Sequence, residues 1–519
     1  MRARLRTIGA LAIAASLLAL PGCGGSNKYR PTGDPLLDLR NPDLQERDRI
    51  EAAQFAWVEV DGGARDRAET RAAMRDLARS LSTPVPIREQ LVRTLMEDPT
   101  PEGRAESREL AAVMLPREKE RTVVAILSQA AGENGWEELT TSLVRSYARP
   151  LDDVEDDIRT ERAALEALHP DQAVSSVVFD VFLEPGDPPA GWDVTRWREG
   201  SRADAWELLS RLDPGGEVRS ALLLRVGGQE TSLPPDAAAL VTDLRRCLHE
   251  LGCVPQTSME LQWLHALLHE GTSDERKLND AWWRQASDAI ARLEGEQRNG
   301  LELRHAEAIR WAAANRSGWL EAPRARLLAE LDARLDGRTV YRRTKELRLK
   351  RTGRAYRLRD VADKLDWADL LTLLVVDDAV HDPGVIERAF LYAEADKDDD
   401  KTSYGGTLQA GDAGAESLGD DAAWRLILFR PRARDRVRDE VFVVGEDLVR
   451  YSDRALAHFR LNAWSHKLSD VAGPSDDDFE QAKRSGRTSI VFTRLAEDRI
   501  NVDCYAPDGS SVDLGEIRR

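Results

Sequence analysis

Residues 488–505 read TSIVFTRLAEDRINVDCY, and β-branched and aromatic residues of the kind found in strands recur along them. Strand-like runs in this part of the chain lie at 423–430, 440–444, 488–493 and 499–505. A short helix is expected at 385–395 and another from 476 to about 485, so helices and strands are interspersed. The sequence therefore predicts an α/β domain over residues 359–519.

Residues 41–172 have a helical pattern. Prolines and glycines divide this stretch into helix-length segments, in which apolar residues recur three or four positions apart, as at Leu91 and Leu95. A pair of such helices cannot bury its apolar face alone, so pairs must stack at a period of about 30–45 residues. The pattern resembles that of HEAT-type α-solenoids, and an irregular helical bundle is the alternative.

Residues 173–358 are expected to form a mainly helical middle domain with a small sheet. The two runs predicted as its strands are 177–182 and 221–226. Each is apolar except at one position, and proline or glycine follows each run. Helices are expected again from about residue 235 to about 350.

The first 22 residues have the composition of a secretory signal peptide. Three arginines precede an apolar run from Ile8 to Leu20, which is shorter than the roughly 20 residues of a membrane span. The sequence Leu20-Pro21-Gly22-Cys23 resembles the bacterial lipobox. That resemblance implies that Cys23 is lipidated and becomes the first residue of the mature chain, with residues 23–40 as a flexible tether. An ordinary signal peptide with a chance cysteine is the alternative.

The net charge and the expected cellular location indicate which classes of partner the chain binds. The formal net charge of −18 argues against nucleic acid as a partner. A lipidated Cys23 would hold the chain to a membrane of the bacterial envelope, facing the periplasm or the outside. Inner-membrane lipoproteins often carry Asp after the cysteine, so Gly24 favours the outer membrane.

The C-terminal domain resembles the JAMM (JAB/MPN) metalloprotease fold. The resemblance rests on YGGTL at 404–408, AHFRLN at 457–462 and GPSDDD at 473–478, together with the strands that follow. In that family two histidines and an aspartate hold zinc, a glutamate acts as general base and a serine assists the oxyanion. The chemistry is that of a three-ligand zinc with one open position.

The family roles carry over to only some residues of this sequence. Ser475 and Asp478 match the Ser-x-x-Asp element, and His458 matches one histidine. Other positions depart from the family's pattern: Arg460 and Asn462 stand where a second histidine would, and Ser403 stands where the glutamate would. His466 is a substitute ligand candidate. The resemblance thus implies a degenerate fold that has lost zinc catalysis, with no cofactor; a zinc site is the alternative.

Two further patterns suggest ligands or cross-links. Cys247 and Cys253 are expected either as two packed thiols or as a disulfide, and with His249 between them they are also a weak metal candidate. His265 and His269 have the i, i+4 spacing of a zincin helix, but Ala266 replaces the glutamate. For this pair a plain surface or core role is the alternative.

These observations predict a lipid-anchored envelope protein that binds or scaffolds a protein partner. The alternative is a JAMM-like zinc peptidase or isopeptidase in the C-terminal domain.

Overall fold

The computed structural model describes most of the chain from residue 32 onward. The residues it does not describe are 1–31, 152–153, 228–232, 344–353, 400, 412–422, 431, 434–435, 437–441, 443–447, 449–453 and 464–467. Cys23 and the expected signal peptide therefore lie outside the described residues. Among those described, no helix combines the length and apolar character that a membrane span needs.

The chain divides into two compact units, residues 1–107 and 108–519. The helices that begin in the first unit are α1 (Pro35–Arg40), α2 (Glu46–Asp61), α3 (Arg67–Arg79), α4 (Val85–Met96) and α5 (Pro101–Met114), and the boundary falls within α5. Asp34 and Asp66 cap α1 and α3 by accepting backbone N–H groups. Helix α2 packs against α1 and α4, so local pairs bury the apolar faces.

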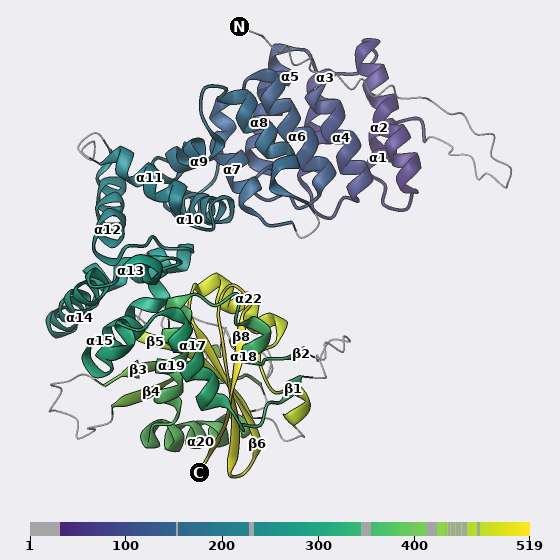
Figure 1. The fold of residues 1–519 in the computed structure, drawn as a ribbon. Helices are drawn as coiled ribbons and strands as arrows, with labels where there is room; N and C mark the ends of the chain where they lie inside the picture. Colours follow the sequence, from purple (N-terminus) through teal and green to yellow (C-terminus); the bar gives the residue numbers. More distant parts are fainter. Residues whose placement is uncertain are drawn as a thin grey trace, which may run out of the picture. The chain divides into compact units, whose positions relative to one another are not determined.

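The second unit continues with helices. They are α6 (Arg121–Asn134), α7 (Thr140–Ala148), α8 (Thr160–Leu168), α9 (Val174–Leu183), α10 (Val194–Leu212), α11 (Glu217–Val226), α12 (Pro235–Leu251), α13 (Ser258–His269) and α14 (Ser273–Ala291). Helix α6 packs against α8, α9 against α10, and α12 against α14. Figure 1 shows this run of helices, and the region is mainly helical, as predicted.

The two strands predicted for the middle region are wrong, because residues 177–182 lie in α9 and residues 221–226 lie in α11. Helix α9 is buried around most of its surface, and its Phe182 ring lies 4.7 Å from the ring of Trp206. A helix buried on several sides is apolar all round, so its sequence carries no period that separates it from a buried strand.

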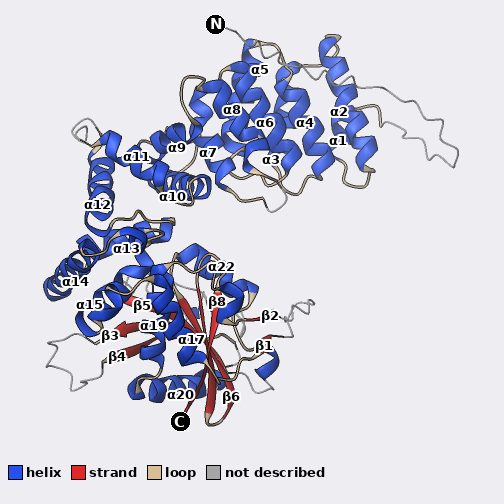
Figure 2. Ribbon diagram, in the orientation of Figure 1, coloured by secondary structure: helices blue, strands red, loops and turns tan. Residues whose placement is uncertain are grey.

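The C-terminal part holds a six-stranded sheet with the order β4-β3-β5-β6-β7-β8, in which only β5 and β6 pair in parallel. Its strands are β3 (Gly405–Ala410), β4 (Trp424–Phe429), β5 (Ala455–Asn462), β6 (Ser489–Ala496), β7 (Arg499–Tyr505) and β8 (Ser511–Arg518). A two-stranded ribbon pairs β1 (Arg342–Arg343) with β2 (Arg354–Ala355). Figure 2 shows the strands in red beside the helices of this region.

Helices surround this sheet. They are α15 (Ala306–Asn315), α16 (Ser317–Leu320), α17 (Arg324–Leu335), α18 (Leu358–Val361), α19 (Trp367–Val380), α20 (Pro383–Lys397) and α22 (Asp476–Ser485). Helix α19 is buried along nearly its whole length and packs against α15, α17 and β7, while α20 packs against β4 and β5. The core of the α/β part therefore lies between α19 and the sheet.

The predicted α/β elements are confirmed where the structure describes them. Residues 423–430 contain β4, residues 499–505 coincide with β7, and residues 488–493 overlap the first part of β6, which continues to Ala496. The helix expected from 476 is α22. Of the run 440–444, only Phe442 is described, so that expected strand falls outside the described residues.

Candidate functional site

His458 lies in the middle of the sheet, on β5, where it pairs with Thr407 on β3 and Ser489 on β6. Its side chain is buried, and neither ring nitrogen has a hydrogen-bond partner among the described residues. Burial, together with the positive charge of Arg487, lowers the pKa of His458 to about 3. The imidazole is therefore neutral in the folded chain at every physiological pH.

Asp478 and Ser475 lie at the start of α22, where they form a capping box. The Ser475 hydroxyl donates to Asp478 Oδ2 over 2.7 Å, and the backbone N–H of Asp478 in turn donates to Ser475 Oγ. Arg460 Nε lies 3.1 Å from Asp478 Oδ1, and both side chains are buried. Asp478 therefore interacts with the cap of its own helix and with Arg460. The guanidinium of an arginine cannot act as a metal ligand.

The remaining residues of the JAMM resemblance make structural hydrogen bonds. The Ser403 hydroxyl donates to the carbonyl of Leu461 over 2.6 Å, which ties the chain before β3 to β5. Two groups of at least three His, Cys, Asp or Glu have ligand atoms within 4.8 Å of one another among the described residues, and neither includes His458 or Asp478. His466 lies outside the described residues.

One of the two groups, His305, Asp366 and Asp369, is a buried ion network. Asp366 and Asp369 form the capping box of α19, and Asp369 lies 3.1 Å from His305 Nε2 and 2.7 Å from an Arg304 nitrogen. Burial alone would raise the pKa of Asp369, but His305 and Arg304 hold it well below its usual range. Because Arg304 already neutralises the carboxylate, this group stabilises the fold and is a poor cation site. No local spacing in the sequence indicates it.

The other group, Asp243, His265 and His269, joins the two histidines of the zincin-like spacing to an aspartate from α12.

The cysteine pattern at the end of α12 does not form such a group among the described residues. Cys247 and Cys253 are buried free thiols, whereas His249 is exposed on α12. A hydrogen bond with Cys253 and burial raise the pKa of Cys247 well above its usual value, so this thiol stays protonated.

A cavity of about 720 Å³ lies between α6, α8 and the segment that joins α7 to α8. Its lining residues are Glu118, Lys119, Arg121, Thr122, Val124, Ala125, Ser146, Arg149, Pro150, Leu151, Val154, Ile158, Arg159, Thr160 and Glu161. We call it the α6–α8 groove. Apolar side chains contribute much of its wall, and the Ile158 side chain is 70% exposed there. The groove lies within the helical region, where the sequence shows only core-forming periodicity, so no sequence signal indicated it.

Buried and half-buried polar groups line part of the α6–α8 groove. Arg159 pairs with Glu161 at 2.5 Å, and Ser146 donates to the same Glu161 oxygen. Burial would raise the pKa of Glu161, but Arg159 outweighs it and lowers the value, so the carboxylate is ionised. Arg149 donates to the carbonyl of Leu115, and burial lowers its pKa. The lining contains four cationic and two acidic side chains, which makes it positive in a chain of net charge −18.

A buried carboxyl pair lies across strands β7 and β8, where Asp503 and Asp513 are cross-strand partners. Asp503 accepts a hydrogen bond from Asn501, and Asp513 accepts from the backbone N–H groups of Tyr341 and Gly515. Burial and the neighbouring Asp513 raise the pKa of Asp503 well above its usual value. Burial raises the pKa of Asp513 to about 6.

This pair gives a pH prediction. Asp513 takes up a proton near pH 6 when folded and near about 3.9 when unfolded, so the stabilisation from protonation is complete below about pH 4 and is lost as pH rises through 6. Asp503→Asn replaces the carboxyl group beside Asp513 with a group that cannot ionise. It is expected to raise the free energy of unfolding at pH 8 by on the order of 1–3 kcal/mol, and the gain should shrink by pH 5.

Urea unfolding at pH 5 and pH 8 measures this effect. Asp508→Asn, at an exposed position in the same β7–β8 hairpin, is the matched control and should leave the pH dependence unchanged. An Asp503→Asn variant that is less stable than the native chain at pH 8 would contradict the assignment.

Comparison with protein-family models, with curated proteins and with solved structures gives no match for this chain. Its function is therefore argued from its own residues.

Proposed function

We propose that the chain is a lipid-anchored bacterial envelope protein that binds a protein partner through the α6–α8 groove. The observation that carries the proposal is the combination of an apolar wall and a positively charged lining in one cavity of about 720 Å³. Ligand sites in proteins are commonly concave, mostly apolar and of about 300–1,000 Å³, with a few placed polar groups.

The chemistry of the groove favours a peptide segment with an apolar side chain and a carboxylate. Val124, Leu151 and Val154 offer an apolar surface, while Lys119 and Arg121 lie exposed at the groove. An apolar side chain gains about 1.5–3 kcal/mol on full burial, and an arginine binds a carboxylate with two parallel hydrogen bonds. The lipobox would add a fixed location at the membrane surface.

A binding role also agrees with the residues of the C-terminal domain. Asp478 is paired with Arg460 and His458 is buried in the sheet without a polar partner, so neither is presented to a substrate. The proposed role of this domain is a structural or binding one within a degenerate JAMM-like fold.

Photo-crosslinking in the intact bacterium tests the groove. A photoreactive amino acid replaces Ile158 in the full chain, and the same replacement at Leu224 on α11, a side chain 64% exposed outside the groove, is the control. We expect a discrete adduct with an envelope protein from position 158 and none from position 224.

A charge reversal then tests the proposed electrostatics. Arg121→Glu should lower the adduct yield from position 158 at least fivefold, because it replaces an attractive charge at the groove with a repulsive one. Arg225→Glu, at an exposed position on α11, should leave the yield unchanged. Adducts of equal yield from positions 158 and 224, or a yield insensitive to Arg121→Glu, would overturn the proposal.

A further inference from the structure

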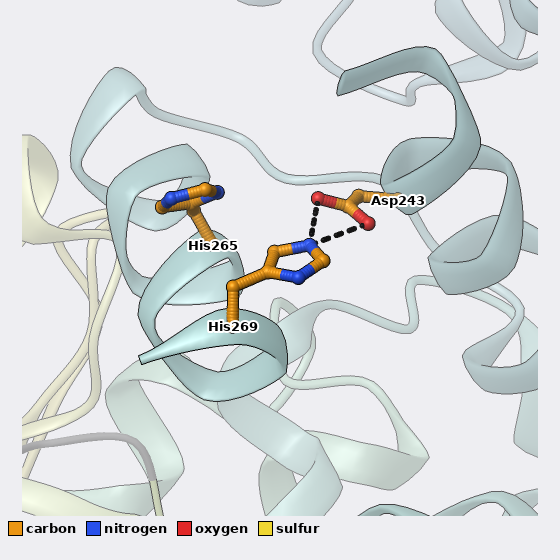
Figure 3. A group of neighbouring side chains, drawn as sticks. All are labelled: Asp243, His265 and His269. Carbon is orange, nitrogen blue, oxygen red and sulfur yellow. Dashed lines mark hydrogen bonds and ion pairs between the residues drawn. The ribbon is translucent and has the colours of Figure 1, made fainter. Parts of the chain in front are cut away.

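The spacing of His265 and His269 places both imidazoles on one face of α13, one turn apart. Helix α12 packs against α13 and brings Asp243 to this face, although Asp243 precedes His269 by 26 residues. Figure 3 shows His269 directed at the Asp243 carboxylate, with His265 one turn earlier on the same helix. We propose that Asp243, His265 and His269 form a binding site for one divalent transition-metal ion, with zinc as the preferred ion.

The distances fit a site that closes around an ion. His269 Nε2 lies 2.8 Å from Asp243 Oδ2 and 3.0 Å from Oδ1, and the ligand atoms of all three residues lie within 4.8 Å of one another. The rings of His265 and His269 are 5.0 Å apart between centroids. Two ligands of a tetrahedral zinc lie roughly 3.3 Å apart. The His269–Asp243 pair therefore needs to separate by about half an ångström, and His265 needs a modest rotation of an exposed side chain.

The metal ion would take the position of a proton. In the hydrogen bond between His269 and Asp243, a proton lies between Nε2 and the carboxylate. A zinc ion bound by both groups displaces that proton from Nε2, and the neutral imidazole then carries its proton on Nδ1. The positive charge of the ion is balanced in part by the buried carboxylate. No lysine or arginine of the described residues pairs with Asp243, and the nearby Arg246 pairs with Glu250 instead.

The lack of a described lysine or arginine paired with Asp243 distinguishes this site from the buried group around His305. There, Arg304 lies 2.7 Å from Asp369 and supplies the positive charge that a metal would bring. At Asp243 the corresponding positive charge is absent among the described residues, and both histidines are exposed. Exposure lets an ion enter and leaves at least one coordination position for water or for a group from another molecule.

The ligand set selects the class of ion. Two imidazoles and one carboxylate suit zinc and its neighbours in the transition series, whereas calcium and magnesium prefer oxygen ligands throughout. Because its ligands come from two helices, the bound ion would link α12 to α13 and raise the resistance of this pair to unfolding. The inference is independent of the α6–α8 groove, which has no residue in common with the site.

The test is zinc binding by the tag-free full-length chain in detergent, after treatment with a chelator. Metal analysis after gel filtration is expected to give one zinc per chain, and an excess of calcium should not displace it. His265→Ala, His269→Ala and Asp243→Asn should each weaken zinc binding at least tenfold. His249→Ala, an exposed histidine on α12 outside the group, should have no effect.

Two further variants locate the zinc. His458→Ala and Cys247→Ser should leave the zinc stoichiometry at one, and circular dichroism checks that every variant is folded. Cobalt substitution should give the visible absorption of a nitrogen- and oxygen-ligated ion, which His269→Ala removes. The proposal is overturned if the native chain binds no zinc, if His269→Ala binds zinc as tightly as His249→Ala, or if the zinc is lost on His458→Ala or Cys247→Ser.

Discussion

Arg219→Met is expected to lower the free energy of unfolding of the 108–519 unit by about 3–5 kcal/mol, since it breaks a buried charge network from one side. Arg219 lies on α11 and is fully buried. Its guanidinium donates to Asp213 Oδ2 and O, Ser210 Oγ, Pro255 O and Gln256 Oε1. It also stacks over the Trp206 ring at 5.7 Å. Methionine fills the volume of the stem but leaves the Asp213 carboxylate and the carbonyls without these donors.

Urea unfolding followed by tryptophan fluorescence measures this loss. Arg225→Met, at an exposed position on the same helix, is the matched control and should change stability by less than about 0.5 kcal/mol. The double variant Arg219→Met with Asp213→Asn should recover part of the loss, because it removes the unpaired charge. A loss below 1 kcal/mol for Arg219→Met would show that the network is not a main support of the α10–α11 region.

Helix α11, which carries Arg219, illustrates what local sequence patterns predict and what they miss. The run 221–226 reads ALLLRV and is apolar except at Arg225. Short, mainly apolar runs occur both in strands and in helices, so the run alone does not decide between them. The choice of helix depends on contacts distant in sequence, such as the bond from Arg219 to the carbonyl of Pro255, 36 residues away. In contrast, β6 and β7 were predictable because β-branched and aromatic residues are concentrated in them and turn residues separate them.

Strand β8 was missed for a related reason. Its sequence SVDLGEIR contains Asp513, Gly515 and Glu516, which are depleted in strands. Tertiary contacts make them acceptable: the backbone N–H groups of Tyr341 and Gly515 satisfy the Asp513 carboxylate, and the Tyr341 hydroxyl donates to Glu516. Such compensation comes from other segments and carries no local signature.

The sequence indicates the two histidines of the candidate metal site but not its aspartate. The i, i+4 spacing of His265 and His269 is a helix-face signal, but Ala266 removes the zincin interpretation, and the third ligand comes from another helix. The C-terminal candidates show the reverse case. The order of motifs suggested a zinc cleft, but the register of β5 and the cap of α22 bring Arg460, rather than a second ligand, to Asp478. In both cases, residues from a different helix or strand determine whether the candidate ligands are brought together.

Cys23→Ser is expected to leave the protein unlipidated, and either uncleaved or displaced from its normal membrane fraction. Lipidation at a lipobox forms a thioether with the cysteine sulfur, and the serine hydroxyl does not replace that thiol. Stable anchoring requires two acyl chains or an equivalent pair of signals, because one chain binds a bilayer only reversibly.

Cell fractionation with immunoblotting measures the change, and mass spectrometry of the native chain should find a diacylated Cys23 at its N-terminus. Ser26→Ala, three residues further along the expected tether, is the matched control and should stay in the membrane fraction. Gly24→Asp should leave the lipid in place but shift the protein toward the inner membrane in a density gradient. A Cys23→Ser variant that is membrane-bound and processed as before would show that another feature holds the chain at the membrane. The α6–α8 groove would then have to be tested for binding without the assumption that lipid fixes its location.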